Sequence, residues 1–177
     1  MLFLFAVLAP REDMQLNAKT QRLARIPPLA VIESDALRLL AFDGIEMTIE
    51  PDSVLFRQGE VADGGYAVIS GSIALERDGE ISTPARLMKT GSLIGLHALV
   101  VNLERPATAT AREKSLLLKL PRGLMLRVLE AFPNSATAFR QYVEESMAAQ
   151  TNALERIASS IDAVAAHYKV RESRTGT

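Results

Sequence analysis

The 177-residue sequence contains no cysteine and only two histidines, His97 and His167. Without cysteine the chain has no disulfide framework, no thiolate nucleophile and no cysteine-ligated zinc or iron–sulfur cluster. A metal site between facing strands would need clustered imidazoles or carboxylates, whereas His97 stands alone. The sequence also lacks the G-x-S-x-G, G-x-x-x-x-G-K-[ST] and H-E-x-x-H motifs of hydrolases, nucleotide triphosphatases and zinc proteases. These absences predict a protein that is not an enzyme and binds no metal.

The sequence also lacks an excess of charge of either sign. Twenty lysines and arginines stand against twenty-one aspartates and glutamates, which gives a net charge of −1. A chain that grips the phosphate backbone needs a basic excess, so we expect no direct binding to nucleic acid. Apolar residues make up 48% of the sequence, which is ample for the core of one domain. The absence of disulfides fits a reducing compartment, and we expect the cytoplasm.

The first nine residues, MLFLFAVLA, are the longest apolar run near the N-terminus. No basic residue precedes them, as one would in a signal peptide, and the run is far shorter than the ~20 residues of a membrane span. Helix-like spacing begins at Met14. We therefore expect residues 1–13 to be an apolar extension outside the domain, either from an overlong start assignment or as a genuine extension, with a signal peptide as the less favoured alternative, and we expect no membrane attachment.

Glycine and proline divide the rest of the chain into helical and extended segments. Residues 16–26 have helical spacing that ends at two prolines, and residues 34–43 predict a second helix with Ser34 as its N-cap and a turn at Gly44. After Gly95 a short helix is expected between two strands, and residues 121–132 predict another helix, which ends at Pro133. Short apolar and β-branched runs between glycine turns predict an antiparallel sandwich or roll, with strands at residues 45–49, 53–57, 66–70, 72–77, 85–89, 107–111 and 115–120.

Two stretches of the sequence resemble the cyclic nucleotide-binding domain family. Residues 55–75, LFRQGEVADGGYAVISGSIAL, match its opening hairpins, and residues 94–99 and 105–111 match its phosphate-binding cassette without insertion or deletion. The resemblance covers about residues 20–150. It implies a mainly β fold with flanking helices: an eight-stranded double-stranded β-helix, which is a jelly-roll-like β-roll, followed by a long C-terminal helix.

The resemblance also implies a site for cyclic AMP or cyclic GMP. In the family an arginine and nearby amides hold the cyclic phosphate, and a glutamate accepts a hydrogen bond from the ribose 2′-hydroxyl. The arginine and the cassette glycine carry over to Arg105 and Gly95. We therefore expect the ligand site, for an anion or a cyclic phosphate, to comprise Gly95, Leu96, His97, Ala98, Arg105, Pro106, Ala107 and Thr108.

Two of these residues depart from the family pattern. Leu96 stands where the family has its glutamate, and Pro106 has no N–H to offer a phosphate oxygen. Losing two hydrogen bonds to charged groups, each worth roughly 1.5–3 kcal/mol, would weaken a cyclic nucleotide by about 10² to 10⁴. The pocket is then a weakened nucleotide site, a site for another small anion, or an empty scaffold. From the residues alone, Arg105 either holds an anion with the start of the short helix, or caps a carbonyl or pairs with Glu104.

The C-terminal part predicts one helical segment, because no glycine or proline occurs between Asn134 and Thr175. Its apolar stripe either joins two copies of the chain or folds back on its own domain, and we expect the homodimer. The segment leaves no room for the winged helix of related transcription regulators. We therefore predict a β-roll with N-terminal helices at residues 14–133, a helix and tail at 134–177, and a sensor that acts through an unknown protein partner. The stripe comprises Leu154, Ile157, Ile161, Val164 and Tyr168.

Overall fold

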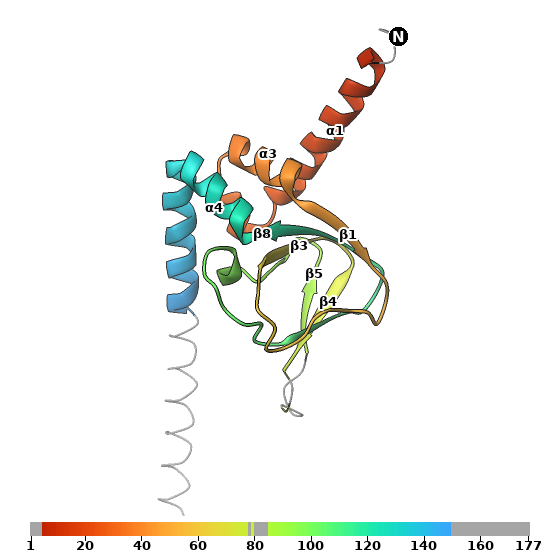
Figure 1. Cartoon of the computed structure of the whole chain (residues 1–177), viewed down its shortest axis with the longest axis vertical. Coiled ribbons are helices and arrows are strands. Elements are labelled where there is room, and N and C mark those ends of the chain that lie inside the picture. The colour runs from red at the N-terminus through yellow and green to blue at the C-terminus, as the bar shows by residue number, and fades with distance from the viewer. Residues whose placement is uncertain (1–4, 78, 80–84, 150–177) are drawn as a thin grey trace, which may run out of the picture. The chain divides into compact units, whose positions relative to one another are not determined.

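Two antiparallel sheets, with helices before and after them in the chain, make up the described part of the protein (Figure 1). A computed structural model describes residues 5–77, 79 and 85–149, with side chains from residue 13 onwards. The chain divides into two compact units, residues 1–140 and 141–177. The elements of the first unit are α1 (Phe5–Leu23), α2 (Pro27–Ala30), α3 (Ser34–Asp43), β1 (Ile45–Ile49), β2 (Val54–Phe56), β3 (Gly64–Ser70), β4 (Ser72–Glu76), β5 (Arg86–Lys89), β6 (Leu93–Ile94), the 3₁₀ helix η1 (His97–Leu99), β7 (Thr108–Ala111), β8 (Ser115–Pro121) and α4 (Arg122–Ala131).

Each sheet has four strands, and the chain passes repeatedly from one sheet to the other. The first sheet has the order β1-β8-β3-β6 and the second has the order β2-β7-β4-β5. All the pairings are antiparallel, and only β4 and β5 follow each other in both sequence and space. This winding is the jelly-roll-like β-roll that the sequence predicts, so the expected fold class is confirmed.

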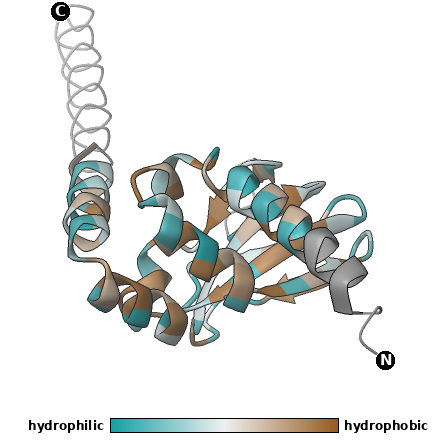
Figure 2. Ribbon diagram, turned by 90° about the horizontal axis from the view of Figure 1, so that it is seen from above, coloured by the Kyte–Doolittle hydropathy of each residue, from teal (hydrophilic) through white to brown (hydrophobic). Residues whose placement is uncertain are grey.

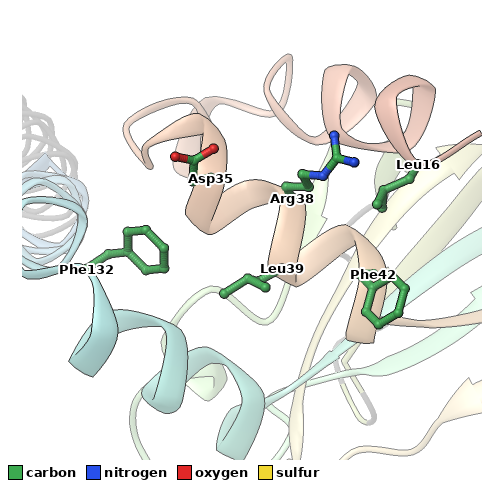
Figure 3. A pocket seen from close by; sticks show the side chains of 6 residues that line it. All are labelled: Leu16, Asp35, Arg38, Leu39, Phe42 and Phe132. Carbon is green, nitrogen blue, oxygen red and sulfur yellow. The ribbon is translucent and has the colours of Figure 1, made fainter. Parts of the chain in front are cut away.

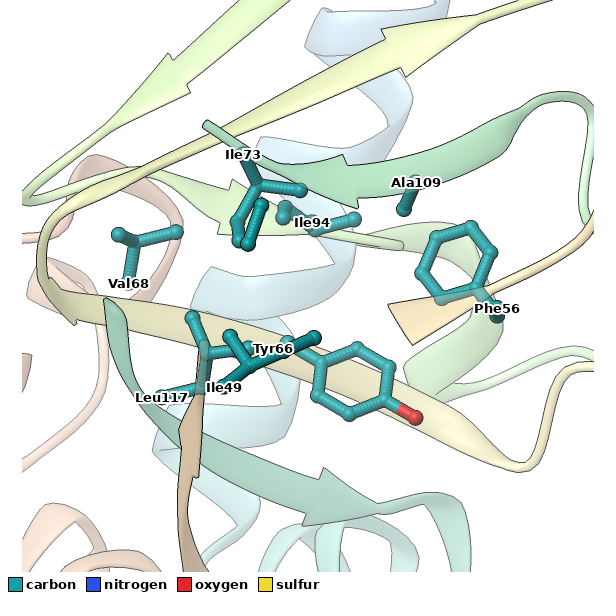
Figure 4. Close-up of a cluster of buried hydrophobic side chains, with 9 residues drawn as sticks. Ile49, Phe56, Tyr66, Val68, Ile73, Ile94, Ala109 and Leu117 are labelled. Carbon is teal, nitrogen blue, oxygen red and sulfur yellow. The ribbon is translucent and has the colours of Figure 1, made fainter. Parts of the chain in front are cut away.

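The main core lies between the two sheets (Figure 4). Alternate residues of the short strands point inward, which is why β7 reads as half-buried and buried residues in turn. Phe56 and Tyr66 face each other here with ring centroids 5.9 Å apart. The buried members of the cluster are Ile49, Phe56, Tyr66, Val68, Ile73, Ile94, Ala109, Ala111 and Leu117.

The helices form a second apolar cluster beside the first sheet. Helix α3 packs against both α1 and α4, and α4 packs against β8. Hydrophobic and hydrophilic residues alternate along these helices (Figure 2), so that one side of each is apolar and the other is polar. Fully or nearly fully buried side chains on this side of the protein include Leu23, Ile26, Leu29, Leu40, Met125 and Phe139.

Several element boundaries differ from the sequence-based predictions. Helix α1 begins at Phe5, nine residues before the expected start at Met14, and β3 begins at Gly64. Strand β6 was not predicted, because two residues are too few to show alternation. Ser34 is not the N-cap of α3. Glu33 occupies that position without a side-chain cap, and its carboxylate accepts a hydrogen bond from Ser135 instead.

Residues 133–149 are helical, which agrees with the expected C-terminal helix. Pro133 opens this helix after Phe132 leaves the helical conformation of α4, so the proline both ends one helix and begins the next. The predicted stripe from Leu154 to Tyr168 lies outside the described residues. The dimer and the alternative in which the stripe folds back therefore both stay predictions.

Candidate ligand-binding site

The loop between β6 and β7 contains the residues expected to bind a ligand. It starts at Gly95, whose φ of +79° suits glycine, and passes through a single 3₁₀ turn at His97–Leu99. The expected short helix is therefore present, but three residues offer no helix N-terminus of the kind that binds anions. Arg105 lies in the loop that precedes β7.

The backbone on both sides of Arg105 is fixed to the loop between β2 and β3. The Arg105 N–H donates to the carbonyl of Glu60 at 2.8 Å, and the Gly59 N–H donates to the carbonyl of Arg105 at 2.9 Å. Val61 and Glu104 form an isolated antiparallel bridge beside these bonds. Because the backbone is held at both its N–H and its carbonyl, the Arg105 side chain starts from a fixed position.

The guanidinium of Arg105 is buried among aromatic rings and backbone. Only 4% of the residue is exposed, and Nη2 donates a hydrogen bond to the carbonyl of Gly64 at 2.9 Å. The guanidinium carbon lies 4.2 Å from the ring centroid of Phe56 and 5.3 Å from that of Tyr66, which is within cation–π range. The structure thus places Arg105 on a carbonyl, as one of the two sequence-based alternatives expected, and does not pair it with Glu104.

The positive charge of Arg105 is only partly balanced. Its Nη2 lies 3.7 Å from Asp63 Oδ1, but the other oxygen of that carboxylate lies 2.5 Å from Lys119 Nζ. Burial lowers the pKa of Arg105 from its usual value, whereas Tyr66 and the carboxylates of Asp63 and Glu60 oppose that shift. A buried guanidinium that shares its carboxylate with a lysine is an attractive position for a further anion.

A small cavity lies directly beside Arg105. Its volume is about 80 Å³, well below the ~300–1,000 Å³ of typical small-molecule pockets. Arg105 is the only ionisable residue of its lining. The lining residues are Phe56, Leu75, Ile94, Gly95, Leu103, Arg105, Pro106 and Ala107.

The expected site residues divide into two groups. Gly95, Arg105, Pro106 and Ala107 line the cavity, whereas Leu96, His97, Ala98 and Thr108 do not. Leu96 is the half-buried N-cap of the 3₁₀ turn, and Ala98 is a buried residue within that turn. The Thr108 hydroxyl accepts a hydrogen bond from the Gln58 N–H at 3.0 Å.

His97 has an unusual environment within the same loop. Its Nε2 is buried, and this nitrogen has no hydrogen-bond partner among the residues that the structure describes. His97 does not line the cavity beside Arg105.

Sequence reasoning missed four residues of the cavity wall. Phe56, Leu75, Ile94 and Leu103 come from three strands and the cassette loop, and they meet only after the two sheets have packed together. Their sequence signal is the alternation of buried residues along short strands, which marks them as core but does not distinguish a cavity wall from a packed interior.

A second hollow lies between α1 and α3 on the surface (Figure 3). Its volume is about 340 Å³, and Leu39 and Phe42 are 42% and 72% exposed there. Arg38 at this hollow already donates to Asp13 and Asn17. The remaining lining is Leu16, Asp35 and Phe132.

The described part of the chain contains neither a group of metal ligands nor a membrane-spanning helix. No group of three or more histidine, cysteine, aspartate or glutamate side chains there is placed to hold a metal ion. None of the helices described combines the length and the apolar character that crossing a bilayer requires.

Comparison with known proteins points to one family. The sequence profile of the cyclic nucleotide-binding domain matches residues 46–132. Over 92 residues, 52% of this chain, the sequence is 34% identical to a cAMP-dependent protein kinase regulatory subunit of Yarrowia lipolytica. Over 149 residues, 81% of this chain, it is 28% identical to Rap guanine nucleotide exchange factor 1 of Caenorhabditis elegans. The matches span only 24% and 14% of these two proteins.

A solved structure agrees with the sequence comparison. The N-terminal domain of a transcriptional regulator from Streptomyces coelicolor superimposes with a TM-score of 0.66 at 26% identity, covering 75% of this chain and 94% of that one. Apart from Ile45 at the start of β1, the strands, the cassette loop and the cavity beside Arg105 lie within the part of the chain that the family profile matches. Residues 46–132 of this chain therefore form a domain of the cyclic nucleotide-binding family.

Proposed function

We propose that this protein is a non-enzymatic sensor or regulatory module that binds an anion at Arg105 and has weak affinity for cyclic nucleotides. The observation that carries this proposal is the buried guanidinium beside a cavity, with a carboxylate that it shares with Lys119. A buried charge without a dedicated counter-ion is costly, and a bound anion would offset that cost. The regulatory relatives support the same role, since one is named as a kinase regulatory subunit.

Weak binding of cyclic nucleotides is expected from the side chains of Leu96 and Pro106 and from the small size of the cavity. Leu96 has no oxygen to accept a hydrogen bond from a ribose hydroxyl, and Pro106 lines the cavity without an N–H to donate. The cavity of about 80 Å³ would also have to widen before a nucleotide entered. A ligand-free interaction module is the alternative, and the Arg105–Gly64 hydrogen bond is the observation that favours it, because it gives the guanidinium a structural role.

The test is to return the two missing contacts. The double variant Leu96→Glu, Pro106→Ala restores an acceptor and an N–H, and each restored bond involves a charged group. We expect its affinity for cyclic AMP, measured by calorimetry, to exceed that of the unaltered protein by about 10². Adding Arg105→Ala should abolish the gain, because all three positions act through one site.

A matched control separates a repaired site from added charge. Val101→Glu places a carboxylate in the same loop at a position that is 55% exposed and does not line the cavity. We expect no gain for Val101→Glu combined with Pro106→Ala. If the folded Leu96→Glu, Pro106→Ala protein binds cyclic AMP no better than its parent, the cassette does not act as a nucleotide site and Arg105 has only its structural role.

The sequence also supports a proposal for the location, assembly and partner of this module. We propose that it works in the cytoplasm as a homodimer joined through the C-terminal segment, and that it passes its signal to a protein partner and not to nucleic acid. The even charge of the chain, 20 basic against 21 acidic residues, supports a protein partner. The apolar stripe of the C-terminal segment supports the dimer.

A further inference from the structure

The cavity beside Arg105 sets an upper limit on the size of a ligand. The cavity volume of about 80 Å³ is well below the ~300–1,000 Å³ of typical small-molecule pockets. A carboxylate with one or two further carbons is an anion of suitably small size. A nucleotide, and any ligand with a ring system, exceeds it unless the walls move.

The walls of the cavity limit the chemistry of the ligand. Phe56, Leu75, Ile94, Leu103, Pro106 and Ala107 present apolar side chains, and Pro106 has no N–H. Phosphate or sulfate would bring more oxygens than one guanidinium can satisfy, and the remaining oxygens would lie against hydrocarbon at a cost in desolvation. A monocarboxylate has two oxygens for the guanidinium and an apolar tail for the walls.

The Nη1 atom of Arg105 lies at the edge of the cavity, beside Gly95. Nη2 is bonded to the Gly64 carbonyl, while Nη1 lies 2.7 Å from the point that a Cβ on Gly95 would occupy. Gly95 itself lines the cavity, so the absence of a side chain there leaves the guanidinium uncovered at the cavity edge. A guanidinium edge binds a carboxylate through two parallel hydrogen bonds.

We propose that the ligand of this site is a short monocarboxylate such as propionate, with its carboxylate on Arg105 and its tail against Leu75, Leu103 and Ala107. This inference rests on the proposed anion-binding function and names the chemical class of the anion. Selection by size arises from the small volume, and selection by charge arises from the single cation in an apolar wall.

The test is a ligand series measured on the full chain by calorimetry and thermal unfolding. Sodium acetate, propionate, butyrate and hexanoate are compared with sodium chloride, sodium phosphate and cyclic AMP at equal ionic strength. From acetate to propionate we expect affinity to rise about fourfold, the gain from burying one CH₂. We expect it to fall at hexanoate, which exceeds the cavity, and we expect chloride and phosphate to give no saturable signal.

Two variants that leave Arg105 in place report on the cavity. Leu75→Ala enlarges it and should move the preferred acid from propionate to one with one or two more carbons. Ala107→Val fills it and should weaken propionate at least tenfold while the protein stays folded. Leu87→Ala, on β5 with 46% exposure and outside the lining, is the matched control and should change nothing.

The outcomes distinguish this inference from the function on which it rests. Carboxylate binding with a size limit that moves in Leu75→Ala supports it. Binding of cyclic AMP or phosphate without carboxylate selectivity overturns the inference but keeps anion binding at Arg105. Carboxylate binding that Ala107→Val leaves unchanged overturns it too, because the acid then lies elsewhere. If no anion binds at all, both proposals are wrong.

Discussion

A side chain at Gly95 would meet the guanidinium of Arg105. The φ of Gly95 is +79°, and a Cβ there would lie 2.7 Å from Arg105 Nη1. Gly95→Ala would therefore meet both backbone strain and a clash with a buried charge. We expect the free energy of unfolding, measured in urea, to fall by about 1–3 kcal/mol.

A second glycine provides the control for Gly95. Gly59 has a similar φ of +83°, but a Cβ there would meet nothing within 4 Å. Gly59→Ala should show the backbone cost alone, about 1 kcal/mol. Equal losses for the two variants would contradict a close approach between Gly95 and Arg105.

Asp63 connects the site to the pH dependence of stability. Its pKa lies below the usual value of about 3.9, chiefly because Lys119 donates a hydrogen bond to it, although burial acts in the opposite direction. A lowered pKa in the folded state stabilises the protein above the unfolded pKa, and the gain is lost as pH falls through the folded value. Lys119→Met should therefore cost less than about 1 kcal/mol at pH 7, since Asp63 is largely exposed.

Unfolding in urea at pH 7 and pH 3 measures this effect. The difference between Lys119→Met and the unaltered protein should shrink on acidification, because the carboxylate that receives the bond becomes protonated. A difference that grows at pH 3 would show that Lys119 stabilises the fold by other contacts.

At the scale of residues, the sequence identified those site residues that occupy fixed places in the cassette pattern. Gly95 and Arg105 follow from the order of the cassette, and both line the cavity. Leu75 and Leu103 could not be identified, because each is an ordinary apolar residue until the two sheets pack together. The volume of the cavity depends on the side chains of several strands at once and has no signal in any one segment.

At the scale of elements, the start of α3 depends on a residue far along the chain. The Glu33 N–H donates to Ser135 Oγ at 3.1 Å, and the Ser135 hydroxyl donates to Glu33 Oε2 at 2.9 Å. Ser135 is fully buried. Ser135→Ala leaves the N–H and the carboxylate without this partner, and we expect a loss of about 1–3 kcal/mol in the free energy of unfolding.

Thr137→Ala is the matched control for Ser135→Ala. The Thr137 hydroxyl also bonds within the helix, to the Pro133 carbonyl at 3.0 Å, but in an exposed position. We expect a change within about 0.5 kcal/mol for this variant, measured by the same urea titration. Similar losses in the free energy of unfolding for both variants would show that Ser135 stabilises its own helix and not the contact with Glu33.

The contact between Glu33 and Ser135 explains why the N-cap of α3 was predicted wrongly, although several strands were predicted well. The strands at residues 45–49 and 115–120 were predicted within one residue, because glycine turns and alternation are local signals. Ser34 was expected to cap α3 because serine is a common N-cap. Instead Glu33 stands at that position and bonds to Ser135, so tertiary contact outweighs local preference.

At the scale of the whole molecule, the predicted dimer depends on residues outside the described part of the chain. We predict a dimer that light scattering at tens of micromolar detects and that Leu154→Asp with Ile157→Asp converts to monomer, because facing carboxylates in a buried seam cannot be solvated. Asn152→Asp with Ser159→Asp, at positions off the stripe, should leave the dimer intact. A monomer for the unaltered protein would rule out this mode of assembly.

The bridge between Val61 and Glu104 has a consequence for motion. The N–H groups of Gly59, Ala62 and Arg105 all donate across the same pair of loops. Neither loop can detach alone, so these three amide protons should exchange with solvent water through one shared opening. A ligand bound to Arg105 would make this shared opening rarer and would slow deuterium uptake at all three amides together. Two of them, Gly59 and Ala62, lie on the loop between β2 and β3, which contributes nothing to the cavity wall.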